Sequence, residues 1–157
     1  MKKKEKNRKK IPYRLKRRSP EKGWRSILEG VRENSSSLSR AYGLTQRASR
    51  AGFDWPNIEG VLEKFDEEMG EFREALVLQD RRKIYEEIGD LLFVLANVSR
   101  FLRIDPERAL KRTLNKFVFR FQYIEASLHR RGKSLRQSDL IEMDRLWEES
   151  KKKKRRS

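Results

Sequence analysis

Apolar residues recur at the three-and-four spacing of an amphipathic helix in two neighbouring stretches, residues 58–76 and 84–102. The polar interruption at 79–82 separates them, and Asp80 within it can cap the second helix. A connection this short predicts that the two helices pack as antiparallel neighbours. The second helix is apolar on most sides from residue 88 onward, so we expect it to be the most enclosed element.

Cap residues predict three further helices on either side of this pair. Serines at 35–37 can begin one that runs to about Arg50, Asp105 followed by Pro106 begins another, and Ser138 or Asp139 can begin the last. The inner face of the middle one is expected to be Leu110, Thr113, Leu114, Phe117, Phe121, Ile124 and Leu128. The sequence therefore predicts an all-α domain, an antiparallel helical bundle.

Each helix of the central pair carries two carboxylates beside its apolar face. Glu68 and Glu71 are three residues apart on the first helix, and Glu87 and Asp90 are three apart on the second. Glu71 lies nine residues before Asp80 and Asp90 ten after it, so the two pairs stand at similar heights in an antiparallel hairpin. We expect the four carboxylates to converge.

Converging carboxylates need a counter-charge. At an effective dielectric constant of about 20, two charges about 4 Å apart repel by about 4 kcal/mol. A divalent cation removes this cost, and a set of oxygen ligands without histidine or cysteine favours Mg²⁺ or Mn²⁺ over Zn²⁺. A solvated acidic face is the ordinary interpretation of one such pair, whereas two facing pairs favour a metal site.

Other polar residues lie on the edges of the same predicted helices. Lys64 shares the strip of Glu68 and Glu71, whereas Glu67 lies just outside it. Asn97 follows Glu87 and Asp90 on their face, where it can contact a substrate or a ligand carboxylate, or pair with backbone as a buried asparagine. Trp55, which precedes a proline at a helix corner, fits a core position better than a base pocket.

The formal net charge of +16 is confined to the ends of the chain. Residues 1–22 contain 12 basic and 2 acidic residues, residues 151–157 contain six basic residues and no acid, and the part between them is neutral. We therefore divide the chain into a basic, disordered tail at 1–22, one domain at 23–150 and a basic tail at 151–157. Such tails suit weak contact with a polyanion such as nucleic acid, or serve only solubility.

The absence of certain residues and segments from the sequence predicts the cellular compartment of the protein. The chain has no cysteine, which fits a reducing compartment, and it has no apolar run of about 18 residues that could span a membrane. The basic N-terminus also lacks the apolar segment of a secretory signal. We expect a cytoplasmic protein.

The acidic motifs resemble those of a known enzyme family. The pattern of Lys64, Glu67, Glu68 and Glu71, followed by 87-EIGDLLF-93, resembles the EExxE…ExxD signature of the MazG nucleoside triphosphate pyrophosphohydrolases. The similarity extends over about residues 38–151 and is to the second, C-terminal domain of that family. Its further matches are 51-AGFDW-55, Asn97, Ala109, Leu110, Lys116, Phe117, Arg120, Phe121 and Trp147.

The resemblance implies hydrolysis of a nucleoside triphosphate to the monophosphate and pyrophosphate by an Mg²⁺-dependent homodimer of the all-α pyrophosphohydrolase fold. Lys116 and Arg120 are then expected to bind phosphates with help from Lys64, and Glu67 to orient or deprotonate the attacking water. Trp147 and Lys151 are expected to close over the nucleotide. The chain has no GxxxxGK[ST] loop, which excludes a P-loop enzyme.

Two alternatives remain at this point. One is a helical nucleic-acid-binding module that acts through its basic tails and whose acids are only a solvated face. The other is a pyrophosphohydrolase of the same fold with a narrower substrate, such as dUTP or phosphoribosyl-ATP.

Overall fold

The computed structural model describes residues 23, 25–31 and 35–153 of the chain. The basic segment 1–22 and residues 154–157 of the C-terminal segment lie outside the described residues. The helices are, in chain order, α1 (Ser37–Arg50), α2 (Ile58–Val77), α3 (Arg81–Phe101), α4 (Pro106–Arg130), the short 3₁₀ helix η1 (Leu135–Gln137) and α5 (Leu140–Lys152). The all-α prediction is confirmed for this part of the chain.

The predicted caps begin the helices. The Asp80 carboxylate accepts hydrogen bonds from the backbone N–H groups of residues 82 and 83, and Asp105 accepts from those of residues 107 and 108, directly before Pro106. Asp139 caps α5, and Ser36 caps α1. These side chains satisfy N–H groups that the first turn of a helix leaves without a partner, each contributing about 1 kcal/mol.

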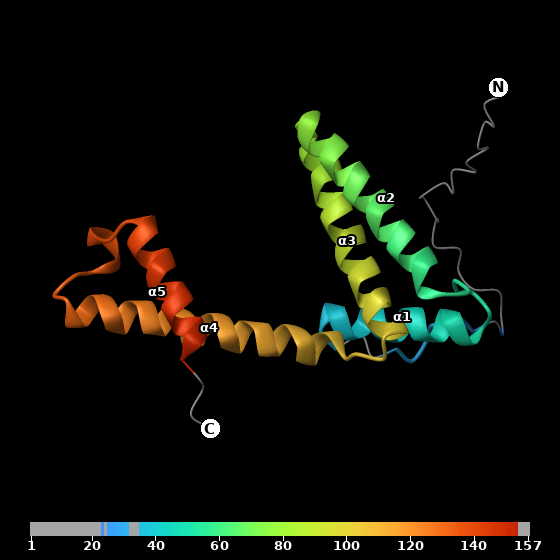
Figure 1. Ribbon diagram of the computed structural model, residues 1–157. Helices are drawn as coiled ribbons and strands as arrows, with labels where there is room; N and C mark the ends of the chain where they lie inside the picture. The colour runs from blue at the N-terminus through green and yellow to red at the C-terminus, as the bar shows by residue number, and fades with distance from the viewer. Residues whose placement is uncertain (1–22, 24, 32–34, 154–157) are drawn as a thin grey trace.

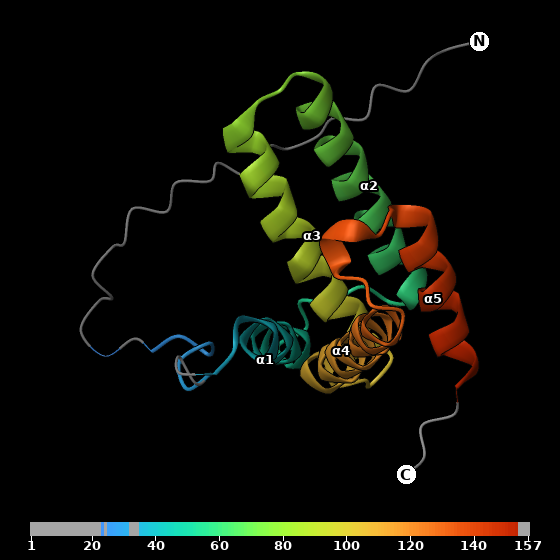
Figure 2. The ribbon, with the colours of Figure 1, turned by 90° about the vertical axis from the view of Figure 1, so that its left-hand side faces the viewer.

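The helices form two hairpins joined at a common base (Figure 1). Helices α2 and α3 pack antiparallel, as predicted, and α1 packs against α3. Helix α4 lies beside α1 and runs across the base of the α2–α3 hairpin (Figure 2). Helix α5 folds back on the far half of α4, where Ile124, Leu128 and Leu146 form a buried cluster.

This arrangement corrects the expectation that α3 is apolar and enclosed on most of its sides: Ile88, Leu92 and Leu95 are about half exposed, at 46%, 51% and 46%. On α4 only the second half of the predicted inner face is covered, whereas Leu114 and Phe117 are 56% and 55% exposed. The helical periodicity is as predicted, but no described element packs over these faces.

Within the described residues, no helix is long and apolar enough to cross a membrane.

Candidate active site

The acidic residues of α2 and α3 meet between the two helices. Glu68, Glu71 and Glu87 each present one carboxylate oxygen, and the three oxygens lie within 4.8 Å of one another. Glu68 and Glu87 are buried, whereas Glu71 is exposed. Asp90, one turn further along α3, is outside this trio but close enough to Glu68 and Glu87 to interact with their charges. We call these four residues the carboxylate centre.

The carboxylate centre raises the pKa of two of its own members. Burial raises the pKa of Glu87, and the negative charges of Glu71, Glu68 and Asp90 add to the effect. The pKa of Asp90 is raised by burial and then by the Glu68 charge, against a smaller opposing effect of Lys64. The energetic cost of packing acids together therefore appears as a raised pKa at both acids of α3, Glu87 and Asp90.

One oxygen of the centre lacks a partner. Among the described residues, the Oε2 atom of Glu87 is a buried side-chain oxygen that accepts no hydrogen bond. Buried polar atoms are nearly always paired, so such an atom calls for a ligand, ion or water.

Lys64 supplies a positive charge at one edge of the centre. Its Nζ atom lies 2.5 Å from the Glu68 Oε1 atom and 3.7 Å from the Glu67 Oε1 atom. Desolvation alone would lower the pKa of Lys64, but its bond to Glu68 and the charges of Glu68, Glu67 and Glu71 outweigh it and raise the pKa. One lysine balances only one of the clustered charges, and it does not reach the Glu87 oxygen.

The donor set fits a hard divalent cation. Several carboxylate oxygens converge, no nitrogen or sulfur ligand is present among them, and one oxygen is buried without a partner. The structure thus defines an all-α protein whose central helical hairpin carries an oxygen-ligand centre able to hold a metal ion.

Two of the remaining predicted residues lie on this hairpin. The Glu67 side chain is 43% exposed beside Lys64, outside the trio of converging oxygens. Asn97 is 3% exposed, and its Oδ1 atom accepts a hydrogen bond of 2.8 Å from Arg100 Nε rather than from backbone.

The predicted residues of α4 and α5 form a separate group on the other hairpin. The Arg120 guanidinium carbon lies 5.3 Å from the Trp147 ring centroid, and the Phe117 ring packs on the same tryptophan at 5.6 Å. Lys116 is exposed, and Lys151 pairs with Glu148. A cavity of about 310 Å³ adjoins Trp147. Within one chain, the fold does not bring Lys116 and Arg120 to the acids, because α4 leaves the α2–α3 hairpin at its base (Figure 1).

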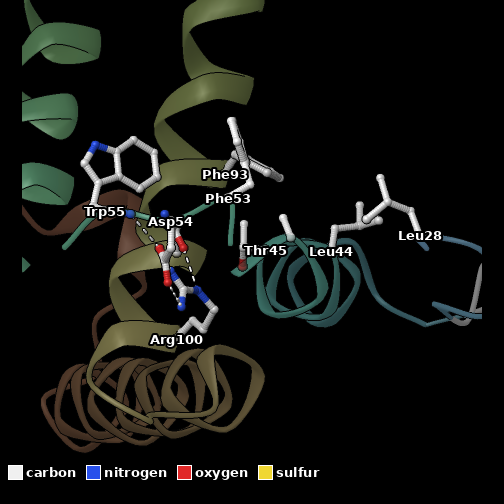
Figure 3. Close-up of a pocket in the computed structure, with 10 residues that line it drawn as sticks. Leu28, Leu44, Thr45, Phe53, Asp54, Trp55, Phe93 and Arg100 are labelled. Atoms are coloured by element: carbon white, nitrogen blue, oxygen red, sulfur yellow. Dashed lines mark hydrogen bonds and ion pairs between the residues drawn. The ribbon is translucent and has the colours of Figure 1, made fainter. Parts of the chain in front are cut away.

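A second cavity, of about 230 Å³, lies further along α3, between this helix, α1 and the segment that precedes α2 (Figure 3). At its edge the Arg100 guanidinium binds Asp54 through two hydrogen bonds, Nη1 to Oδ2 at 2.9 Å and Nη2 to Oδ1 at 2.6 Å. Burial alone would raise the pKa of Asp54, but hydrogen bonds from Arg100, Ser49 and the Trp55 backbone lower it below its ordinary value. The other lining residues are Leu28, Leu44, Thr45, Ala48, Phe53, Phe93 and Asn97.

Sequence reasoning missed Arg100 as a partner of Asp54. The two residues are 46 positions apart, and nothing in either local pattern joins them. The available indication was an arginine three residues after Asn97, near the end of an otherwise apolar stretch.

Comparisons with known proteins find similar sequences over this part of the chain. Residues 57–124, which contain all four acids, match the family described as the MazG nucleotide pyrophosphohydrolase domain. The nucleoside triphosphate pyrophosphohydrolase/pyrophosphatase MazG of Thermotoga maritima is 44% identical over 115 residues, which are 73% of this chain and 44% of that protein. The nucleoside triphosphate pyrophosphohydrolase of Escherichia coli K12 is 35% identical over 136 residues, 84% of this chain and 51% of that protein.

A shorter match of 49% identity over 71 residues is to the uncharacterized protein YabN of Bacillus subtilis, of which it covers 14%. Residues 57–124 thus carry the match to the MazG domain, and the chain is similar to these relatives. It spans about half the length of the MazG relatives from Thermotoga and Escherichia.

The first prediction concerns the charge of Glu87. The pKa of Glu87 is higher in the folded protein than in the unfolded chain, so the folded protein binds this proton more tightly. As the pH rises from the pKa of the unfolded chain to the higher pKa of the folded protein, the proton is lost and the folded state loses stability. We expect Glu87→Gln to raise the melting temperature of the metal-free protein at neutral pH and to reduce this loss. Thermal unfolding with chelator at a series of pH values measures both effects.

Glu63→Gln, an exposed change on α2 away from the centre, is the matched control and should change little. A Glu87→Gln protein that is less stable than the parent at neutral pH, without metal, would show that the carboxylates are not in mutual repulsion.

Proposed function

We propose that this chain hydrolyses nucleoside triphosphates to nucleoside monophosphates and pyrophosphate at the carboxylate centre. The observation that carries the proposal is the convergence of Glu68, Glu71 and Glu87 around a buried oxygen without a partner. The names of the Thermotoga and Escherichia relatives describe the same reaction class. A purely nucleic-acid-binding role is not favoured, because it required the acids to form a solvated face and two of them are buried.

Mg²⁺ is the proposed ion, with Mn²⁺ as a substitute, and Glu68, Glu71, Glu87 and Asp90 are its proposed ligands. When bound, the ion supplies charge neutralisation and orientation for phosphate oxygens. Glu67 lies beside the ligands and within 3.7 Å of Lys64, and we assign it to orienting and deprotonating the attacking water. Lys64 is already held by acids on one side and can turn toward a phosphate.

We also propose that the working enzyme is a homodimer. Exposed apolar residues recur on faces of α3 and α4 that no described element covers, among them Ile88, Leu92 and Leu95 on α3 and Leu114 and Phe117 on α4. Exposed patches of this kind mark interaction surfaces in soluble proteins. A second copy of the chain offers the same uncovered apolar faces, and its α4–α5 hairpin can cover the open α2–α3 hairpin.

Such a dimer would also complete the active site. In one chain the cations Lys116 and Arg120 lie on a different hairpin from the acids, and phosphoryl transfer needs both kinds of charge at one phosphate chain. We therefore assign Lys116, Arg120 and Lys151 of one copy to the phosphates bound at the acids of the other. Asn97 contacts substrate from α3, and Trp147 packs over it from the side of the second hairpin.

Removing one ligand charge tests the reaction. Glu71→Gln preserves the size of an exposed side chain and should nearly abolish pyrophosphate release from nucleoside triphosphates at matched Mg²⁺. It should also weaken the rise in melting temperature that Mg²⁺ binding produces by mass action. An enzyme with Glu71→Gln that is as active as the parent would refute the assignment of the centre.

The role of Arg120 can be separated from its contact with Trp147. Arg120→Ala should lower kcat/KM by at least about tenfold, equivalent to about 1.4 kcal/mol of transition-state stabilisation. Arg112→Ala, an exposed arginine of the same helix, should leave it unchanged. Unchanged kinetics of Arg120→Ala with a lower melting temperature would assign Arg120 to the cation–π contact alone.

The dimer is tested by a charge on its proposed apolar surface. Leu114 is 56% exposed on α4, so Leu114→Glu is compatible with the fold of a single chain but should leave a buried charge in a dimer. We expect this variant to sediment as a monomer and to lose pyrophosphate release. Ile27→Glu, at a 57% exposed position outside both hairpins, is the control. A parent protein that is active and monomeric would exclude the dimer.

A further inference from the structure

We propose that the chain binds nucleic acid through its phosphates, at a positively charged surface on the base of the molecule. This binding is additional to the proposed hydrolysis, and it involves neither the carboxylate centre nor the cations assigned to the triphosphate. We call the surface the basic surface, and its members are Arg40 and Arg50 of α1, Arg108, Lys111 and Arg112 of α4, and segment 1–22.

Positive and negative residues are separated between the parts of the fold. Helix α1 has three arginines and no acid, and α4 has six lysines and arginines against two glutamates. Helix α2 has the opposite balance, with seven acids against one lysine and one arginine. Because α1 and α4 lie side by side at the base of the α2–α3 hairpin, the base is positively charged and the hairpin carries the negative charge (Figure 1).

The cations in the first half of α4 form a strip opposite its apolar face. At about 100° per residue, Arg108, Lys111 and Arg112 lie within about 100° of one another, on the side of the helix away from Phe117. All three are exposed. Among the described residues, Lys111 and Arg112 have no ion-pair partner, and Arg108 has only Asp105, with 3.7 Å between Nε and Oδ2. The strip therefore presents positive charge that the fold itself does not neutralise.

The arginines of α1 lie together on its outer face, where the N-terminal part of the chain is attached. The Arg47 Nη1 atom donates hydrogen bonds to the backbone oxygens of Ile27, at 2.9 Å, and Glu29, at 2.6 Å. Arg40 and Arg50 are exposed on the same side of the helix, without an ion-pair partner among the described residues. One arginine thus holds the chain on α1, and the other two remain available to a ligand.

Segment 1–22 enters the fold at this face of α1. It contains 12 basic and 2 acidic residues, and the residues that follow it are those that Arg47 binds. Its charge is therefore attached to the positive base rather than to the acidic hairpin. Charges of one sign on one side of a protein add to a common potential, which attracts a polyanion to the base and repels it from the hairpin.

A nucleic acid fits the basic surface better than an anionic membrane does. Lysine and arginine bind the phosphates of nucleic acids whatever the base, so a strip of cations needs no pocket. A helix that lies on a membrane inserts apolar side chains. The exposed large apolar residues of α4, Leu110, Leu114, Phe117 and Val118, all lie outside the strip. The strip thus offers contacts to phosphates without an anchor for lipid.

The salt dependence of binding tests the proposal. Fluorescence anisotropy of a fluorescein-labelled single-stranded oligonucleotide is measured with chelator over a series of KCl concentrations. The logarithm of the association constant should fall linearly with the logarithm of the salt concentration. Lys111→Gln combined with Arg112→Gln should remove two phosphate contacts. We expect this to flatten the slope by about 1.4 and to weaken binding more than about tenfold at about 0.1 M KCl.

Arg81→Gln combined with Lys83→Gln is the matched control, because it removes the same charge from exposed positions on the α2–α3 hairpin. It should leave the slope unchanged. Equal losses in the two double variants would attribute binding to net charge alone. Unchanged binding in the α4 variant would place all binding on segment 1–22. Either result overturns the proposal, as does a parent that binds no oligonucleotide.

The contribution of segment 1–22 is tested in the full chain. Lys3→Gln combined with Lys4→Gln should also flatten the slope, since each lysine contacts a phosphate. An unchanged slope would contradict the part of the surface assigned to this segment.

Vesicles of phosphatidylcholine and phosphatidylserine are the second probe. Binding to these vesicles but not to the oligonucleotide would identify a membrane-binding surface and overturn the proposal. Neither Mg²⁺ nor a nucleoside triphosphate is present in these measurements, so their outcome is independent of whether the chain hydrolyses nucleotides.

Discussion

Crowding of negative charge between α2 and α3 is the constraint on which the site depends. Two buried glutamates face each other across the hairpin with one exposed glutamate and one aspartate nearby, and only Lys64 among the described residues offsets them from within. Burial and repulsion raise the pKa of Glu87 and Asp90, so the hairpin is less stable with its acids ionised than it would be with neutral side chains. A cation relieves the same repulsion. The instability and the capacity to bind metal have one physical origin.

Helix α3 connects the carboxylate centre to the cavity beside α1. Its first half carries Glu87 and Asp90, and its second half carries Asn97 and Arg100, the residues that shape the cavity beside α1. Because a helix has a fixed rise per residue, the distance between the two places cannot vary much as the hairpin moves. The Asp54–Arg100 pair ties the segment that precedes α2 to the same helix.

The parts of the molecule differ in how much of their apolar surface is buried. The α4–α5 hairpin buries Ile124, Leu128 and Leu146, whereas the first half of α4 and much of α3 leave leucines half exposed. Half-exposed leucines contribute less to the stability of a single chain than their number suggests, since the hydrophobic gain follows the area removed from water. The cations Lys116 and Arg120 lie on α4, whereas the acids lie on α2 and α3.

The sequence alone determined the features that depend on near neighbours. Asp80, Asp105 and Asp139 cap helices because their side chains reach N–H groups two or three residues ahead, and helical periodicity placed the carboxylates on one face. Counting residues from Asp80 to Glu71 and to Asp90 predicted that acids of the two helices meet, because a short connection leaves few geometries, although Asp90 itself lies outside the trio of converging oxygens. The tertiary structure alone decided the direction of α4, the exposure of Leu92 and the pairing of Arg100 with Asp54. These depend on contacts between segments far apart in the chain, whose relative placement no local pattern specifies.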